Sequence, residues 1–352
     1  MQKFRALKYM LVYVTPAVVL YSLWAADAWA FTAVIVLFGF IPLLELFTKG
    51  SQENLSEAEE AVMKEDKIYD FFLYSLLPLQ YLILWYFLNQ VSLPESHKVG
   101  LITAFGMSCG VLGINAAHEL GHRNSWYEQL MSKLLLFSTL YMHFFIEHNR
   151  GHHKNVSTDE DPASSRYGET VYAFYVRSII GSWLSAWRLE QQRLEKIQKS
   201  VWSWHNEMLR FQVAQAALLG LIGWYFGTYT MLYYVFGALM GILLLETVNY
   251  IEHYGLRRKK VGNHYERTMP IHSWNSNHPI GRLMLLELSR HSDHHYMANR
   301  KYQTLRYHDD SPQMPTGYPG MMLLSFVPPI WFWVMHRAIA RYKQTHAGEA
   351  LA

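Results

Sequence analysis

The residues best suited to chemistry in this sequence are histidines gathered in three short clusters. One cluster is His291, His294 and His295, and offsets of three and four residues place side chains on one face of a helix. Nine of the 18 histidines belong to these clusters or end an apolar run, namely His118, His122, His148, His152, His153, His253, His291, His294 and His295. Neutral imidazole binds Fe, Zn, Cu and Ni, so the pattern predicts a metal site, and nine ligands suit two ions better than one.

Acidic side chains adjoin several of these histidines. Neutral imidazoles leave the charge of two divalent ions uncompensated, so nearby carboxylates are expected to orient the rings and offset that charge. With one further histidine, the candidates for this supporting role are Glu119, Glu147, Glu252, Asp293 and His272. The alternative for each is an ordinary polar side chain with no part in the site.

The segment from His118 to His122 also matches a rival pattern. Its sequence, His-Glu-Leu-Gly-His, fits the H-E-x-x-H signature of zinc proteases, in which the glutamate is the general base. Such an enzyme uses three protein ligands and a water molecule, which would leave the other histidine clusters without a purpose. An intramembrane zinc protease is therefore only a remote alternative.

Long apolar runs must position these clusters. The chain has 352 residues, and its mean hydropathy is −0.03 because apolar runs alternate with charged, histidine-rich segments. Runs of about 18 or more apolar residues are typical of membrane spans. Six are expected, at about 9–25, 30–47, 68–88, 99–117, 209–226 and 231–250. The run 131–146 begins and ends near histidine clusters, so we expect it to be re-entrant or interfacial.

Basic residues in the short loops predict the orientation. Lysine and arginine concentrate at positions 3–8 and 49–67, whereas the opposite loops carry only Lys98. We therefore expect an all-α integral membrane protein of the inner (cytoplasmic) membrane, a six-helix bundle with its active site on the cytoplasmic side. Residues 1–352 would form a single domain, with a histidine-rich catalytic head of residues 118–208 and 251–352.

Composition excludes some classes of protein. The net charge of +3 does not suggest a nucleic-acid partner. The single cysteine, Cys109, excludes a disulfide framework and a cysteine-ligated cluster within this sequence. If the site needs electrons, they must come from a separate protein or a different cofactor.

The clusters resemble those of the membrane di-iron desaturases and hydroxylases, and within them the membrane-bound alkane 1-monooxygenase family. The resemblance covers roughly residues 115–319 and rests on the segments 118–122, 147–153, 249–256 and 288–295, with further likeness at 272–277, 300–306 and 312–318. It implies six spans, two iron ions (Fe2+/Fe3+) and the nine histidines as ligands. It also implies O2-dependent hydroxylation of medium- and long-chain n-alkanes to 1-alkanols, with electrons from NADH through a reductase and rubredoxin.

The resemblance further implies a docking surface for a separate rubredoxin, which is typically acidic. Basic residues that follow the ligands are the candidates, namely Arg257, Arg258, Lys259, Lys260, Arg300, Lys301 and Arg306. The alternative is a positive-inside or lipid-headgroup patch. Alternative functions are a related hydroxylase of aryl-methyl or other hydrophobic substrates, a fatty-acyl desaturase, and a metal transporter or store.

Overall fold

The computed structural model describes residues 2–345, which are mostly helical and include one two-stranded sheet. Residue 1 and residues 346–352 of the predicted domain and head lie outside the described residues. Within the described range, five segments are helical, long enough and apolar enough to cross a membrane, namely Arg5–Ala25, Ala28–Leu46, Lys67–Ser92, Lys98–Gly121 and Thr228–His253. The chain is therefore a helical membrane protein, and five of the predicted spans have the required length and composition.

The predicted sixth span is the helix α14 (Glu207–Phe226), which has 20 residues. Arg210 and two glutamines in its first half lower its hydropathy, and it is not among the five segments above. The run 131–146 forms no single helix, because α10 (Trp126–Ser138) ends before α11 (Phe144–Glu147) begins. Both helices are too short to span a bilayer, as expected for this run.

The chain divides into two compact units. The first consists of Met1–Leu37, Lys67–Gly151 and Ser182–Leu245, and the second of Phe38–Asp66, His152–Gly181 and Glu246–Ala352. Four helices contribute residues to both units, namely η3 (Ile35–Phe40), η5 (His148–His152), α13 (Val171–Lys196) and α15 (Thr228–His253).

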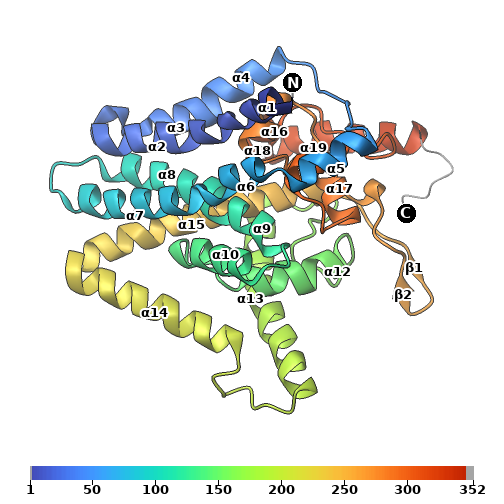
Figure 1. Ribbon diagram of the computed structural model, residues 1–352. Helices are drawn as coiled ribbons and strands as arrows, with labels where there is room; N and C mark the ends of the chain where they lie inside the picture. The colour runs from blue at the N-terminus through green and yellow to red at the C-terminus, as the bar shows by residue number, and fades with distance from the viewer. Residues whose placement is uncertain (1, 346–352) are drawn as a thin grey trace. The chain divides into compact units, whose positions relative to one another are not determined.

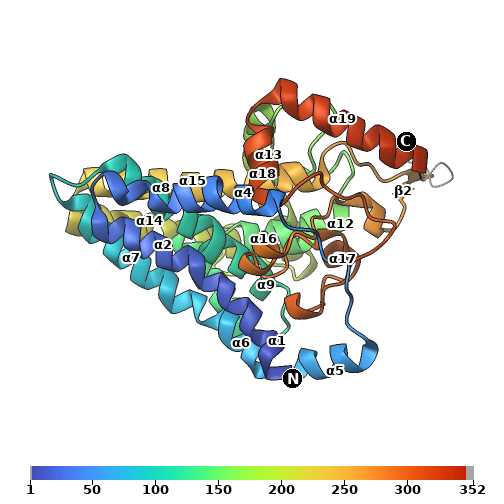
Figure 2. The ribbon, with the colours of Figure 1, turned by 90° about the horizontal axis from the view of Figure 1, so that it is seen from above.

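The first unit is a bundle of helices. Besides α10, α11 and α14 it contains α1 (Gln2–Leu7), η1 (Lys8–Tyr13), α2 (Val14–Ala25), η2 (Ala28–Phe31), α3 (Thr32–Val34), α6 (Lys67–Tyr74), α7 (Leu76–Ser92), α8 (Lys98–Ser108), η4 (Cys109–Asn115) and α9 (Ala116–Gly121). Helices α2, α7 and α8 lie side by side in both views (Figures 1 and 2), and α9 packs against α10. The segment from α8 through η4 to α9 is one continuous helical run that leads to the first histidine cluster.

Close approach of two helices in this bundle depends on glycine. A side chain at Gly237 of α15 would come within 2.5 Å of the Phe105 ring, and one at Gly241 would overlap Cys109. Gly237 and Gly241 form a G-x-x-x-G pattern, which lets helix backbones approach closely in membranes. Between α7, α8 and α10, the buried Gln80 amide bonds Ser108 at 2.6 Å and Ser138 at 3.2 Å.

The second unit contains short helices joined by long ordered loops. Its elements are α4 (Ile41–Leu46), α5 (Glu57–Glu65), α12 (His153–Asn155), β1 (Lys260–Val261), β2 (His264–Tyr265), η6 (Pro270–His272), α16 (Pro279–Met284), α17 (His291–Tyr296), η7 (Tyr302–Thr304), α18 (Tyr318–Ser325) and α19 (Pro328–Thr345). Helix α4 packs against α16 and α18, and α17 packs against η6. The antiparallel hairpin of β1 and β2 extends from this unit (Figure 1).

Replacing Gly241 with leucine should destabilise the bundle of the first unit. The new side chain would overlap Cys109 and nearby backbone, and overpacking of this kind costs about 1–3 kcal/mol. The measurement is the thermal unfolding midpoint of purified protein in detergent. The matched control is Gly220→Leu, since a Cβ at Gly220 meets nothing within 4 Å. Equal midpoints for the two variants would contradict the glycine-dependent contact.

Candidate metal centre

Four buried histidines of the second unit bring their ring nitrogens together. They come from the end of η5, the end of α15 and the helix α17, and are His152, His253, His291 and His295. One ligand atom from each lies within 4.8 Å of the others. The Nε2 atom of His291 is 3.2 Å from that of His253 and 2.8 Å from that of His295.

This spacing fits a metal ion. Imidazole–metal bonds of about 2.1 Å place two ligands at a right angle about 3.0 Å apart, close to the distances between these rings. A neutral imidazole nitrogen either donates or accepts a hydrogen bond, so hydrogen bonds alone do not explain why Nε2 of His291 lies near two other Nε2 atoms. Four imidazoles are a donor set for iron, zinc, copper or nickel.

Asp161 orients one histidine of this cluster. Its Oδ2 lies 2.9 Å from Nδ1 of His152, which leaves the Nε2 atom of that ring for a metal. Ser164 donates to the same oxygen at 2.5 Å, and the backbone N–H of Ala163 donates to Oδ1. Burial by itself would raise the pKa of Asp161, but the contacts with His152 and Ser164 hold that pKa below its usual value. Asp161 is therefore a fixed carboxylate at the edge of the site.

Asn275 holds the helix that carries two other histidines of the cluster. Its Oδ1 accepts the backbone N–H of Ser292 at 2.8 Å, and its Nδ2 donates to the Ser292 hydroxyl at 2.6 Å. This satisfies a backbone donor in the first turn of α17, where no side chain from the helix's own N-cap does so. The start of α17 is thereby tied to the loop that precedes it in sequence, and His291 and His295 then lie one turn apart.

Glu252 and Tyr318 lie beside the same cluster. Oε2 of Glu252 is 3.2 Å from Nε2 of His291, and the Tyr318 hydroxyl donates to Oε1 of Glu252 at 2.7 Å. Burial and the neighbouring Glu252 raise the pKa of Tyr318 well above its usual value, so the phenol keeps its proton. The arrangement holds a buried carboxyl group beside the histidine cluster.

His153 and His294 form a separate pair in the second unit. Their Nε2 atoms are 3.1 Å apart, and each residue is the sequence neighbour of a member of the four-histidine cluster. The sequence predicted that His291, His294 and His295 share one helical face. In the structure, His291 and His295 belong to the four-histidine cluster, whereas His294 faces His153.

The first unit contains a trio of histidines, His118, His122 and His148. Nε2 of His122 is 3.1 Å from Nε2 of His148, and the His118 and His148 ring centroids are 4.5 Å apart. Phe144 stacks on the His148 ring with centroids 4.7 Å apart, which fixes the plane of that imidazole. These rings also have the spacing of ligands to one ion.

The predicted supporting residues have different roles. Glu119 pairs with Arg123 at 2.6 Å, and Glu147 is buried beside Gly151. The His272 imidazole pairs with Glu266, while the backbone of His272 hydrogen-bonds the His253 ring. Asp293 bonds Arg300, His308 and the backbone N–H of Arg306, and within residues 2–345 none of its hydrogen bonds reaches a ligand histidine.

Most of the arginines that were predicted to dock the electron donor instead form contacts within the fold. The guanidinium of Arg258 donates to the backbone carbonyls of Lys154, Val156 and Glu266. Arg257 donates to a backbone carbonyl and lies 3.8 Å from Asp159.

Two further arginines of the predicted docking set bond the same carboxylate. Arg300 and Arg306 both contact Glu60. The backbone carbonyl of Lys301 holds the turn η7, and Lys260 is exposed on the hairpin next to Lys259.

Sequence reasoning missed Asp161 and Asn275 and gave Tyr318 no role. Asp161 lies nine residues after His152 in a loop, beyond any helical spacing. Asn275 and Tyr318 lie within segments 272–277 and 312–318, which carried the family resemblance, so that likeness was the only signal for them.

Similarity to known proteins extends over most of the chain. The family described as fatty acid desaturase matches residues 97–340. Alkane 1-monooxygenase 1 of Pseudomonas aeruginosa is 42% identical over 328 residues, which are 91% of this chain and 85% of that protein. Alkane 1-monooxygenase 1 of Alcanivorax borkumensis is 39% identical over 330 residues, which are 90% of this chain and 80% of that protein.

A more distant relative is also similar. The xylene/toluene monooxygenase hydroxylase component of Pseudomonas putida is 29% identical over 248 residues, which are 69% of this chain and 65% of that protein. The matches to the alkane enzymes cover more of the chain and have a higher identity, so they indicate the narrower family. The chain belongs to the alkane 1-monooxygenase family, within the wider family of fatty acid desaturases.

Proposed function

We propose that this protein uses O2 to hydroxylate the terminal carbon of medium- and long-chain n-alkanes, giving 1-alkanols. The observation that carries the proposal is the buried cluster of His152, His253, His291 and His295 in a chain of this family. An alkyl C–H bond has no acidic proton, so acid–base groups alone cannot attack it. One oxygen atom enters the alcohol and the other leaves as water, with two electrons from a donor and two protons.

The proposed cofactor is a pair of iron ions. The four-histidine cluster of the second unit would hold one, and the histidine trio of the first unit would contribute ligands to the other. When bound, iron supplies the activation of O2. In this scheme Asp161 orients His152, and Tyr318 keeps Glu252 hydrogen-bonded beside His291.

The proposed topology has six spans, with α14 as the additional one. Only three residues of α14 are buried, Met208, Phe211 and Ile222, so most of this apolar helix needs a lipid environment. The basic segments 3–8 and 49–67 support a topology in which the N-terminus and the histidine-rich head face the cytoplasm from the inner membrane.

The proposed electron donor is a separate rubredoxin, reduced by an NADH-dependent reductase. An iron–sulfur centre held by cysteines alone needs four thiolates, and this sequence has one cysteine. Because the guanidinium groups of Arg258, Arg300 and Arg306 bond groups within the second unit, the docking cations that we favour are Lys259 and Lys260 of the hairpin.

The reaction is tested with purified, iron-loaded protein in lipid vesicles, supplied with rubredoxin, its reductase and NADH. We expect 1-alkanols from linear alkanes between octane and hexadecane, identified by gas chromatography with mass detection, and about two iron ions per chain. His291→Ala should lose both activity and iron. Alkenes or aryl alcohols as the main products, from a panel that includes xylene, would instead favour a desaturase or an aryl-methyl hydroxylase.

Replacing Asp161 with asparagine should weaken iron retention by about 10- to 100-fold, because the amide no longer provides a carboxylate partner for Nδ1 of His152. Metal content after dialysis against a graded chelator measures the effect. Asp159→Asn is the matched control, since the Asp159 carboxylate is 77% exposed and contacts Arg257 rather than a ligand. Equal iron retention in both variants would contradict the role of Asp161.

Reversing the charge of Lys259 and Lys260 together to glutamate should raise several-fold the rubredoxin concentration needed for half-maximal turnover, because long-range attraction to an acidic donor is lost. The rate at saturating rubredoxin should stay unchanged. Lys343→Glu, an exposed reversal in α19, is the control. If donor dependence is the same in all three proteins, the hairpin is not the docking surface.

A further inference from the structure

A pocket of about 720 Å³ lies wholly within the first unit, and apart from His122 its lining has no part in the proposed reaction. Its lining includes Gly121 and His122, at the end of the span-length helix Lys98–Gly121, and extends to the start of α14. Since a spanning helix ends near the lipid headgroups, this pocket lies at the level of the membrane surface.

Four cations surround this pocket. They are Lys133, Arg150, Arg193 and Arg210, and their side chains are 26%, 33%, 37% and 44% exposed, so each is accessible to a ligand from solvent. A fifth cation, Arg123, also lines the pocket but is buried in ion pairs with Glu119 and Asp70. Four cationic side chains therefore line the accessible wall.

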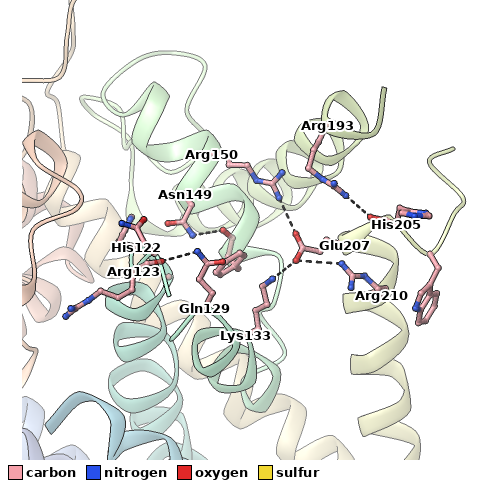
Figure 3. A pocket seen from close by; sticks show the side chains of 14 residues that line it. His122, Arg123, Gln129, Lys133, Asn149, Arg150, Arg193, His205, Glu207 and Arg210 are labelled. Atoms are coloured by element: carbon pink, nitrogen blue, oxygen red, sulfur yellow. Dashed lines mark hydrogen bonds and ion pairs between the residues drawn. The ribbon is translucent and has the colours of Figure 1, made fainter. Parts of the chain in front are cut away.

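Two carboxylates share the four accessible cations. Glu207 lies 2.5 Å from Nζ of Lys133, 3.6 Å from Arg150 and 3.8 Å from Arg210, and Figure 3 shows it in the middle of these three. The fully buried Glu190 pairs with Arg193 at 2.6 Å and with Arg150 at 3.4 Å. Four cations with two carboxylates leave a surplus of two positive charges, which a phosphate group can offset.

The helix that begins at this pocket is apolar and exposed. Leu221, Trp224 and Tyr225 of α14 are exposed, and so is Val213, one turn after Arg210. Trp204, which precedes α14 and lines the pocket, is 66% exposed. Tryptophan of this kind is enriched at the headgroup level of membranes. The pocket thus joins a cationic cradle to a surface suited to acyl chains.

We propose that the pocket binds the phosphate headgroup of an anionic phospholipid, with the acyl chains lying along α14. Lys133, Arg150 and Arg210 contact the phosphate, and Trp204 packs against the glycerol and the upper chain. Basic pockets between helices at the membrane surface are suited to such headgroups. Because His122 lines the same pocket, the bound lipid also shields one side of the histidine trio from water.

The test measures lipid binding to the iron-loaded full chain in a neutral detergent, by titration followed with native mass spectrometry. The probes are dioctanoyl phosphatidylglycerol, dioctanoyl phosphatidylcholine and inorganic phosphate. We expect saturable binding of the first, with much weaker binding of the zwitterionic lipid and of free phosphate. Equal binding of both lipids overturns charge recognition, and equal binding of phosphate and phosphatidylglycerol overturns the lipid as occupant.

Arg210→Glu is the variant that locates the site, because Arg210 is partly exposed and lies 3.8 Å from Glu207, its ion-pair partner among residues 2–345. Each unit of charge near a membrane anion changes affinity about fivefold, so reversal should weaken phosphatidylglycerol binding by roughly 30-fold. The milder Arg210→Gln should weaken it by about fivefold.

Arg188→Glu is the matched control for this reversal. Arg188 is exposed on α13 outside the pocket, and its variant should bind within twofold of the parent protein. Unchanged binding by both Arg210 variants, or equal weakening in Arg188→Glu, overturns the pocket as the lipid site. Because the readout is binding, the result does not depend on the proposed hydroxylation.

Discussion

The second unit is organised around four buried imidazoles whose nitrogen atoms lie too close together to be explained by packing alone. The Nε2 atom of His291 is within 3.2 Å of two others, in a region from which water is excluded. An ion at their centre would turn this arrangement into a favourable one, and Asp161 and Glu252 lie where a carboxylate would compensate part of its charge. The loops of the unit hold these groups in place.

The candidate metal-site histidines could be identified from the sequence because helical periodicity applies to them. The spacing of four residues, from His118 to His122 at the end of α9 and from His291 to His295 in α17, brings side chains to one side of a helix without any tertiary information. The groups that fix those rings lie in loops, where no period exists. Asp161 reaches His152, and Asn275 reaches Ser292, only after the chain has folded back. His272 contributes through its backbone, which side-chain chemistry cannot reveal.

Hydropathy predicted the long helices well. Unpaired backbone groups are costly in lipid and apolar side chains are costly in water, and a long apolar helix across a membrane avoids both costs. It was less informative where polar residues gather at one end, as in the first half of α14. It also gave no sign of the π-helical turns η4 (Cys109–Asn115), which precedes His118, and η5, which contains His148 and His152. Such wide turns often occur at functional sites, and they alter the 3.6-residue period on which the sequence argument relied.

A basic residue in the sequence can be used for contacts within the fold and need not add charge to the surface. Arg258 joins the loop after α12 to the hairpin, because its donors meet carbonyls at 154, 156 and 266. Arg290 does the same between 51–53 and 305. A guanidinium has five donors in a rigid fork, so it can bond several carbonyls at once, whereas lysine cannot do so with the same geometry. The arginines near the histidine cluster therefore hold the surrounding loops together, and lysine side chains are better suited to solvent and to partners.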